Sequence, residues 1–395
     1  MENFNFCSPT YFAFGKASEQ RLGELTKRYG GSKVLLHYGQ QSVVKNGLLD
    51  LAKKSLDREG IAHVELGGAL PNPRADLVYQ GIDLCRRESV DFIIGLGGGS
   101  AIDSAKAIAV GVCYEGDFWD LYEGKADTTK ALPVACVLTL AATGTEGSNS
   151  SVINKQDEGK KYGLSSELIR PVFSIMNPEY TYSLPAYQTA CGIVDMLSHI
   201  LERYLSNTTE VDLTDRLCEA VMKTLIENGR KAMAKPDDYG ARANLMWSGT
   251  IAHNNLLGLG REQDWSSHQM EHELSALYDV AHGAGLAVVF PAFMTYTMPK
   301  HLWRFVQLAD RVWGKEVDYE NPERTALAGI KAFRDYFKEL GMPTTFEELG
   351  AKEEDIPYLA SRVRIKSQSG KLGNFEPLTR EQVADVYRLM LAKNQ

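Results

Sequence analysis

Three of the eight histidines in this 395-residue chain lie close together in the segment "HQMEHELSALYDVAHGAG". His268 and His272 are four residues apart, so they share one face of a helix. His282 follows ten residues later, just before small residues that indicate the start of another helix. Imidazoles gathered in this way are typical of a site for a borderline divalent metal such as Zn²⁺ or Fe²⁺.

A second pair with the same spacing, Asp195 and His199, lies in "GIVDMLSHILERYL". Taken alone, this pair is most simply a hydrogen bond between an aspartate and a histidine in a core. Taken with the later histidines, it completes a set of one carboxylate and several imidazoles that would bind a divalent ion and leave room for a substrate. Four histidines are present where three are needed, so either His268 or His272 could support a ligand instead of being one.

The stretch "IIGLGGGSAIDSAKAIA" has the pattern of a strand, a glycine-rich turn and a helix. Gly97, Gly98 and Gly99 allow a ligand to approach the backbone closely, while Ser100 and Asp103 form a capping-box pattern. A helix N-terminus favours an anion, so we interpret this turn as a pyrophosphate site. A ligand-free turn is the alternative, because Ser100 breaks the GxGxxG pattern. A second loop of small residues, "TGTEGS", also follows a strand, where open α/β sheets bind ligands.

The end of the first predicted strand bears on the choice of dinucleotide. A site for NAD usually sets an acidic side chain against the ribose 2′-hydroxyl, but "HYGQQSVVKNG" offers Gly39, Gln40 and Ser42, with Lys45 nearby. Neutral donors accept a 2′-phosphate that an aspartate would repel. An ordinary helix start is the alternative reading. The sequence favours NADP(H) over NAD(H).

The elements that must position these residues change in character along the chain. Short apolar runs such as "SKVLLHYG" and "VDFIIGLG" alternate with helical patterns in the first half, which predicts an open parallel α/β sheet. Beyond Pro185 the patterns are almost all those of amphipathic helices. We therefore predict a dinucleotide-binding α/β domain over 1–184 and an all-helical metal-binding and substrate domain over 185–395.

The composition, with 44% hydrophobic and 24% charged residues, is that of a soluble globular protein. A net charge of −8 argues against binding to nucleic acid, because no basic region is present to displace counterions. Neither a signal peptide nor a run of eighteen apolar residues is found, so secretion and membrane spanning are not expected. Six widely spaced cysteines indicate free thiols in a reducing compartment, and we expect a cytoplasmic protein.

Nearly end to end, the chain resembles the iron-containing (group III) alcohol dehydrogenase family, and within it the NADPH-dependent butanol dehydrogenases and aldehyde reductases. The motifs that carry the resemblance are "NFNFCSPTYFAFG", "GGALPNP", "GLGGGSAIDSAK", "VLTLAATGTEGS", "PVFSIMNPEYTYSLP", "GIVDMLSHILERY" and "DWSSHQMEHELSA…AHGAGLA". The resemblance implies a Rossmann-like domain and a helical domain with the active site between them, as in the dehydroquinate synthase-like fold. It also implies hydride transfer between NADP(H) and primary aliphatic alcohols or aldehydes, and a homodimer through the N-terminal strand edge.

Carried over motif by motif, the family's functional residues fall on positions that this chain fills. The metal ligands would be Asp195, His199, His268 and His282, which leaves His272 as a proton relay beside the site. The cofactor residues would be Gly39, Gln40, Ser42, Gly97, Gly98, Gly99, Ser100, Asp103, Thr139, Thr143 and Ser148. A lysine at the nicotinamide ribose matches Lys161, with Lys160 as the alternative, so His272 and Lys161 are the catalytic candidates.

Two rival functions follow from the same motifs. The first is another member of the superfamily, a glycerol dehydrogenase or a dehydroquinate synthase, although the polyanionic substrate of the latter would demand more Arg and Lys than the metal motifs contain. The second is a metal-dependent hydrolase without a nucleotide, against which the glycine-rich turn argues. Trp265, Leu256 and Leu257 are candidates to line an apolar substrate cleft, with core packing as the alternative.

Overall fold

The structure is a computed structural model that describes residues 1–365, 367 and 369–394. The chain forms two compact units. A sheet unit comprises Cys7–Leu184 and Asp237–Asn254, and a helical unit comprises Met1–Phe6, Pro185–Pro236 and the chain from Asn255 onward. The first unit boundary in the main part of the chain falls between Leu184 and Pro185, and helix α9 (Tyr239–His253) belongs to the sheet unit.

The sheet unit is built on six parallel strands in the order β1-β8-β5-β4-β2-β3. Their bounds are β1 Tyr11–Phe14, β2 Lys33–Tyr38, β3 Ala62–Leu66, β4 Phe92–Gly97, β5 Val134–Leu138 and β8 Phe173–Met176. The predicted α/β fold class is confirmed. Strands β1 and β8 have only four residues each, which is too short for a periodic pattern to reveal them.

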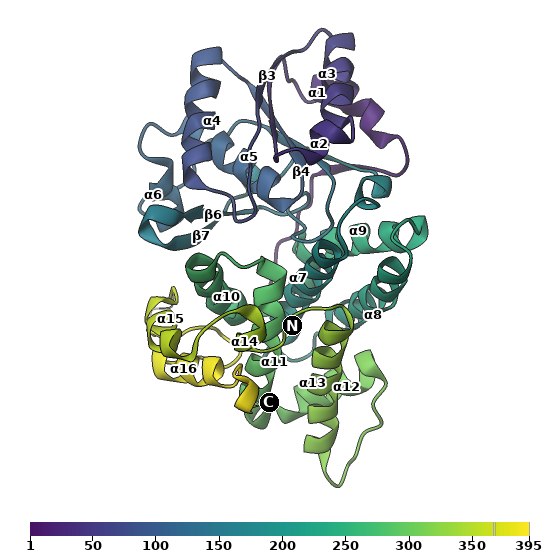
Figure 1. Cartoon of the computed structure of the whole chain (residues 1–395), viewed down its shortest axis with the longest axis vertical. Helices are drawn as coiled ribbons and strands as arrows, with labels where there is room; N and C mark the ends of the chain where they lie inside the picture. Colours follow the sequence, from purple (N-terminus) through teal and green to yellow (C-terminus); the bar gives the residue numbers. More distant parts are fainter. Residues whose placement is uncertain (366, 368, 395) are drawn as a thin grey trace. The chain divides into compact units, whose positions relative to one another are not determined.

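Alternate residues of the central strands face opposite layers of helices. Val34 and Leu36 pack in the cluster that includes α1 (Leu22–Arg28) and α3 (Leu48–Arg58). Leu35 and Ile93 pack in the cluster of α4 (Ala75–Glu88) and α5 (Gly99–Cys113). Figure 1 shows these two layers on either side of the strands. Because both faces are covered, the strands read as continuous apolar runs, and only their ends are available to ligands.

Smaller elements complete the sheet unit. Strands β6 (Ser150–Lys155) and β7 (Lys160–Ser165) form an antiparallel hairpin beside α6 (Phe118–Glu123). The short helix α2 (Ser42–Lys45) follows β2.

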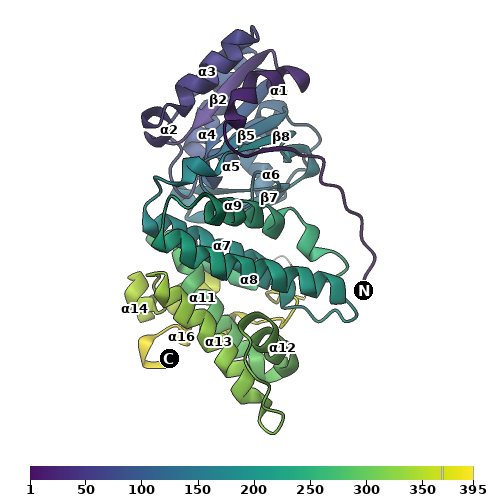
Figure 2. The same ribbon diagram turned by 90° about the vertical axis from the view of Figure 1, so that its right-hand side faces the viewer.

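The helical unit contains the amphipathic segments that the sequence predicted. Its helices are α7 Ala186–Tyr204, α8 Asp212–Ala234, α10 Ser266–Tyr278, α11 His282–Thr297, α12 Leu302–Trp313, α13 Pro322–Glu339, α14 Phe346–Leu349, α15 Ile356–Arg362 and α16 Arg380–Arg388. Figure 2 shows α7 and α8 running side by side. None of the helices in the described part of the chain is long and apolar enough to span a bilayer.

Helix α11 lies at the centre of this unit. It is buried almost all round, from Gly283 to Met294, and it packs against α7, α10, α13 and α16. A helix that is apolar on every face can be stable only inside a core. The start of α11, at His282, is therefore held firmly against α7.

Helices α7 and α11 approach each other closely at Gly283. A Cβ atom at this position would lie 2.1 Å from the main-chain oxygen of Cys191 on α7. Backbone cannot move aside as a flexible side chain can, so only glycine is accommodated here.

We predict that Gly283→Ala destabilises the protein by about 3 kcal/mol, at the upper end of overpacking effects. Thermal unfolding should show a Tm lower by roughly 4 °C for a chain of this length. Gly240→Ala is the matched control, because Gly240 is an exposed helical glycine whose added Cβ would meet only the Asp238 side chain, at 3.4 Å. Equal Tm values for the two variants would contradict the proposed close packing.

Candidate metal and nucleotide sites

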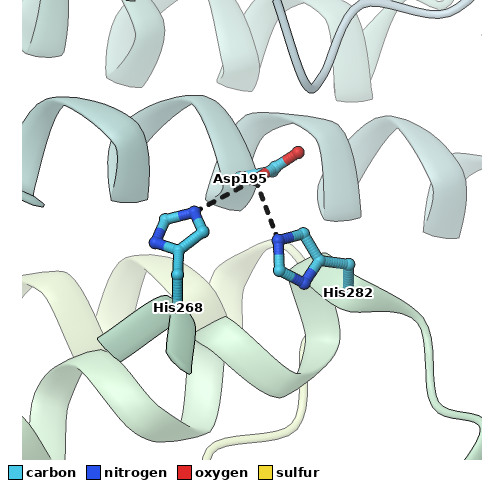
Figure 3. Close-up of side chains that lie close together, drawn as sticks. All are labelled: Asp195, His268 and His282. Carbon is cyan, nitrogen blue, oxygen red and sulfur yellow. Dashed lines mark ion pairs between the residues drawn. The ribbon is translucent and has the colours of Figure 1, made fainter. Parts of the chain in front are cut away.

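Three helices of the helical unit bring the predicted metal ligands together. Asp195 and His199 lie on α7, His268 lies in the first turn of α10, and His282 begins α11. The Oδ1 atom of Asp195 is 3.6 Å from His199 Nε2, 3.9 Å from His268 Nε2 and 3.7 Å from His282 Nε2. Figure 3 shows His268 and His282 directed at Asp195 from the opposing helices.

These separations fit ligands of one metal ion better than hydrogen bonds. They exceed the roughly 3.2 Å limit of a good N–H···O bond. Two atoms that each lie about 2.1 Å from a shared Zn²⁺ or Fe²⁺ can be no more than about 4.2 Å apart. His268 Nε2 is buried and has no hydrogen-bond partner among the described residues. The ligand atoms of Asp195, His268 and His282 all lie within 4.8 Å of one another, so this donor set fits a divalent ion, and His199 lies next to Asp195.

Two buried glutamates hold two of these imidazoles in place. Glu202 Oε1 accepts the Nδ1–H of His268 at 2.8 Å and also its main-chain N–H at 2.9 Å. Glu271 Oε2 forms a short hydrogen bond with His282 Nδ1, and its other oxygen accepts from the Ser275 hydroxyl. A carboxylate at Nδ1 keeps the proton there and leaves the Nε2 lone pair for a metal.

Neither glutamate was predicted from the sequence. Each carries a local signal, since Glu202 follows His199 by three residues and Glu271 follows His268 by three. Glu202 nevertheless supports His268 on a different helix, and Glu271 supports His282 in the same way. Only the packing of the helices assigns each carboxylate to its histidine.

His272 lies beside this cluster. It is buried, and its ring centroid is 5.7 Å from that of His282. The ligand-type atoms of His272, Glu271 and His282 also lie close together. This second group shares His282 with the first site, and its Glu271 is the hydrogen-bond partner of His282. The position of His272 fits the predicted place next to the ligands.

The residues predicted to line a substrate cleft have different surroundings in the structure. Leu257 is completely buried and belongs to the core. Trp265 has the left-handed backbone φ of 88°, and its ring centroid lies 5.2 Å from that of His268. The Arg203 guanidinium lies 4.7 Å from the centre of the Trp265 ring. Trp265 is thus held firmly beside a predicted metal ligand, whereas Leu257 has a packing role.

In the sheet unit, the two predicted nucleotide loops lie against each other. The glycine-rich turn follows β4, and Gly97 has a φ of 149° that other residues rarely adopt. An added Cβ on Gly99 would lie 2.6 Å from the Thr143 side chain, and Thr139 N–H donates to Gly97 O at 2.9 Å. Neighbouring parallel strands end at the same edge, which brings Thr139 and Thr143 to the glycine turn.

The predicted capping box is wrong. Helix α5 begins at Gly99, its N-cap is Gly98, and no side chain caps it, so Ser100 lies within the first turn. The Asp103 carboxylate instead accepts from the Thr145 hydroxyl at 2.6 Å and from the Val152 N–H at 2.9 Å. The Asp103 carboxylate is therefore used by Thr145 and Val152, which are far from it in the chain. A local sequence pattern could not show these contacts.

The remaining predicted cofactor residues have varied surroundings. Ser148 is fully buried and its hydroxyl contacts Ser150, so it faces into its own loop. Gly39, Gln40 and Ser42 follow β2 at its carboxyl end, and both Gln40 and Ser42 are exposed there.

The two candidate lysines of β7, Lys160 and Lys161, differ in burial and in their contacts. The Lys160 ammonium lies 2.8 Å from Glu123 and 2.5 Å from Glu158, and these carboxylates raise the pKa of Lys160 above its usual value. Lys161 is buried and is paired with Asn154 across the hairpin. The ammonium group of Lys160 is therefore engaged in two ion pairs with carboxylates.

Comparison with known proteins identifies the class that this fold and these sites define. The family model described as iron-containing alcohol dehydrogenase matches residues 9–178, and the model of the C-terminal part of the Fe-containing alcohol dehydrogenase family matches residues 189–391. The chain therefore belongs to the iron-containing alcohol dehydrogenase family and is an oxidoreductase. The predicted family resemblance is confirmed, and the rival glycerol dehydrogenase, dehydroquinate synthase and hydrolase assignments are not favoured.

Individual relatives cover almost the whole chain. NADH-dependent butanol dehydrogenase A of Clostridium acetobutylicum is 41% identical over 98% of this chain and 99% of its own length. The NADPH-dependent aldehyde reductase YqhD of Escherichia coli is 35% identical, again over 98% and 99%. The crystal structure of NADH-dependent butanol dehydrogenase A from Thermotoga maritima superposes with a TM-score of 0.96 at 41% identity, covering 99% of both chains.

We predict that Glu271→Gln weakens metal binding about 10- to 100-fold, because the amide cannot hold the Nδ1 proton of His282 as a carboxylate does. Competition with a chelator, followed by metal analysis, measures this change. Glu273→Gln is the control on the same helix, since the Glu273 carboxylate lies 4.0 Å from the Arg362 guanidinium. Unchanged metal affinity in Glu271→Gln would contradict the assigned role.

Proposed function

We propose that this enzyme interconverts short primary aliphatic aldehydes and alcohols, using a nicotinamide dinucleotide and a divalent metal ion, Fe²⁺ or Zn²⁺. The observation that carries the proposal is the convergence of three imidazole Nε2 atoms on one oxygen of Asp195. The proposed ligands are Asp195, His199, His268 and His282. The named relatives, butanol dehydrogenases and an aldehyde reductase, support this substrate class.

The proposed chemistry follows from what these residues hold. A bound divalent ion supplies positive charge that stabilises alkoxide character on a substrate oxygen, and the dinucleotide supplies or accepts the hydride. Glu202 and Glu271 orient His268 and His282, so that these nitrogens are preorganised before substrate arrives. The carboxylate of Asp195 lowers the net charge of the site, which limits how strongly a substrate oxygen is retained.

We propose His272 and Lys161 as the catalytic side chains. His272 is buried next to His282, where an imidazole can pass the alcohol proton toward solvent. The ribose hydroxyls of the nucleotide are the rival carriers of this proton. Lys161, on the buried side of β7, is proposed to contact the nicotinamide ribose.

For the nucleotide we propose the pyrophosphate at Gly97, Gly98, Gly99 and Ser100, with Asp103, Thr139, Thr143 and Ser148 shaping the neighbouring loop. At the adenosine end we propose a preference for NADP(H). The residues after β2, Gly39 and the exposed Gln40 and Ser42, include no carboxylate to repel a 2′-phosphate. The names of the relatives include both NADH-dependent and NADPH-dependent enzymes. Membership of the family therefore does not determine the nucleotide, and the proposed preference depends on the residues after β2.

We further propose a cytoplasmic homodimer. All six cysteines are free, which suits a reducing compartment. Strand β1 is an edge strand of the sheet, and Phe14 at its end is 41% exposed. An edge strand with an exposed aromatic residue is suited to pairing with a second copy.

We predict that Asp195→Ala combined with His282→Ala abolishes both metal binding and aldehyde reduction, because two of four ligands are removed. Metal analysis and NADPH-dependent butanal reduction, on protein loaded separately with Fe²⁺ and Zn²⁺, measure the effect. His63→Ala, in strand β3, is the control and should retain both properties. Undiminished reduction in the double variant would exclude the proposed metal site.

We predict that His272→Phe keeps the bound metal but lowers kcat by about 10²-fold or more, the usual contribution of a proton-transfer group. Steady-state kinetics and metal analysis on the same sample make the comparison. If metal and turnover both persist, His272 only packs, and the ribose hydroxyls become the proton carriers.

We predict a kcat/KM for NADPH at least about tenfold above that for NADH, which corresponds to roughly 1.4 kcal/mol. Gln40→Asp should reverse this preference by repelling the 2′-phosphate, whereas the neutral control Gln40→Asn should preserve it. A wild-type preference for NADH, or an unchanged ratio in Gln40→Asp, would contradict the proposed adenosine site.

A further inference from the structure

Lys106, on helix α5, is a fully buried lysine that the proposed reaction does not use. Its ammonium nitrogen lies 2.7 Å from Thr145 O, 2.9 Å from Ser148 O and 2.9 Å from Ser150 O. The Thr145 hydroxyl is a fourth partner, at 2.8 Å. Two main-chain carbonyl groups of one loop and that of Ser150, the first residue of β6, therefore converge on a single positive charge.

This arrangement supplies hydrogen-bond donors to the buried loop between β5 and β6. Residues 143–149 form no helix or strand, yet Thr145, Glu146 and Ser148 are buried. Buried carbonyl groups need hydrogen-bond partners, and a loop cannot supply them from regular ladders. An ammonium group has three N–H donors, which matches the three carbonyl oxygens.

The charge of Lys106 is itself supported. Burial lowers the pKa of Lys106 to about 8, while the carboxylates of Asp103 and Glu146 oppose that shift. Asp103 also accepts from the Thr145 hydroxyl, so cation, hydroxyl and carboxylate form one chain of contacts. A charged hydrogen bond in a buried site is stronger than a neutral one.

Further contacts hold the loop from its other sides. Arg170 Nη1 donates to Gly147 O at 2.5 Å, and the Thr250 hydroxyl of α9 donates to Glu146 Oε1 at 2.5 Å. Helix α5 begins at Gly99, two turns before Lys106, and Gly99 lies directly against Thr143. Lys106 thus connects the loop to the same helix that carries the glycine-rich turn.

We propose that Lys106 is a positioning residue whose ammonium serves as an internal cation, holding the 143–150 loop in its nucleotide-binding shape before the nucleotide arrives. The inference rests on the proposed function, because it takes this loop as part of the nucleotide site. Ordering the loop in advance removes an entropic cost from nucleotide binding. Lys106 acts through Thr143 and its neighbours and does not touch the nucleotide itself.

The test replaces Lys106 by methionine, which keeps most of the side-chain volume and removes the charge. We expect amide hydrogen exchange in residues 143–150 to accelerate at least about tenfold, with exchange in β4 unchanged. We expect the NADPH dissociation constant, measured by fluorescence titration, to rise at least about tenfold, which equals roughly 1.4 kcal/mol. Metal content should remain that of the wild type, because the proposed ligands lie in the helical unit.

Ser104→Ala is the matched control, since Ser104 is fully buried on the same helix and its hydroxyl has no hydrogen-bond partner among the described residues. It should alter neither loop exchange nor NADPH affinity. Wild-type exchange and affinity in Lys106→Met would overturn the proposal. Faster exchange throughout the sheet unit would also overturn it, because the role of Lys106 would then be general stability.

A second variant covers the case in which Lys106→Met does not fold. Thr145→Val removes one oxygen partner and retains the charge, and we expect a smaller acceleration of exchange confined to the loop. Unchanged loop exchange in Thr145→Val would contradict the proposal. If wild-type protein fails to bind NADPH, the proposed function is wrong, whereas the exchange measurements still decide whether Lys106 orders the loop.

Discussion

The buried carboxylate of Asp195 is the constraint on which the helical unit depends. Removing a carboxylate from water costs several kcal/mol unless a compensating charge lies close by. The nearest imidazole nitrogens are 3.6–3.9 Å away, which is too far for strong hydrogen bonds. A divalent ion among them would add compensating positive charge. Two of the helices that carry the proposed ligands, α7 and α11, pack so closely that a Cβ atom on Gly283 would meet the backbone of Cys191.

The two units meet a similar physical requirement in opposite ways. In the helical unit, carboxylates and imidazoles from separate helices gather around the place proposed for a cation. In the sheet unit, the chain provides its own cation, and carbonyl groups of one loop gather around Lys106. Buried charges of this kind specify a particular arrangement of neighbours, because each misplaced partner leaves a costly unpaired group. Both arrangements therefore favour preorganised sites over flexible ones.

Specificity within this family depends on much smaller features than the fold. The relatives at 41% and 35% identity have names that differ in nucleotide, although each aligns over almost the whole chain. The residues proposed to contact a ribose 2′-substituent form a short segment after β2, and a carboxylate introduced there would alter the charge that a 2′-phosphate meets. The proposed metal ligands and the glycine-rich turn have no proposed contact with the ribose 2′-position. They can therefore stay the same while nucleotide preference changes.

Local patterns in the sequence were sufficient for the central parallel strands, the glycine-rich turn, the amphipathic helices and the i,i+4 pairs Asp195–His199 and His268–His272. Periodicity and spacing express such features directly, because they depend on residues that are neighbours along the chain. Only the tertiary structure assigned Glu202 and Glu271 to their histidines, brought α9 to the sheet unit, turned Asp103 from a supposed helix cap into a partner of Thr145, and surrounded Lys106 with carbonyl groups. Those contacts join residues far apart in the chain, and burial, which no local pattern measures, determines which of them form.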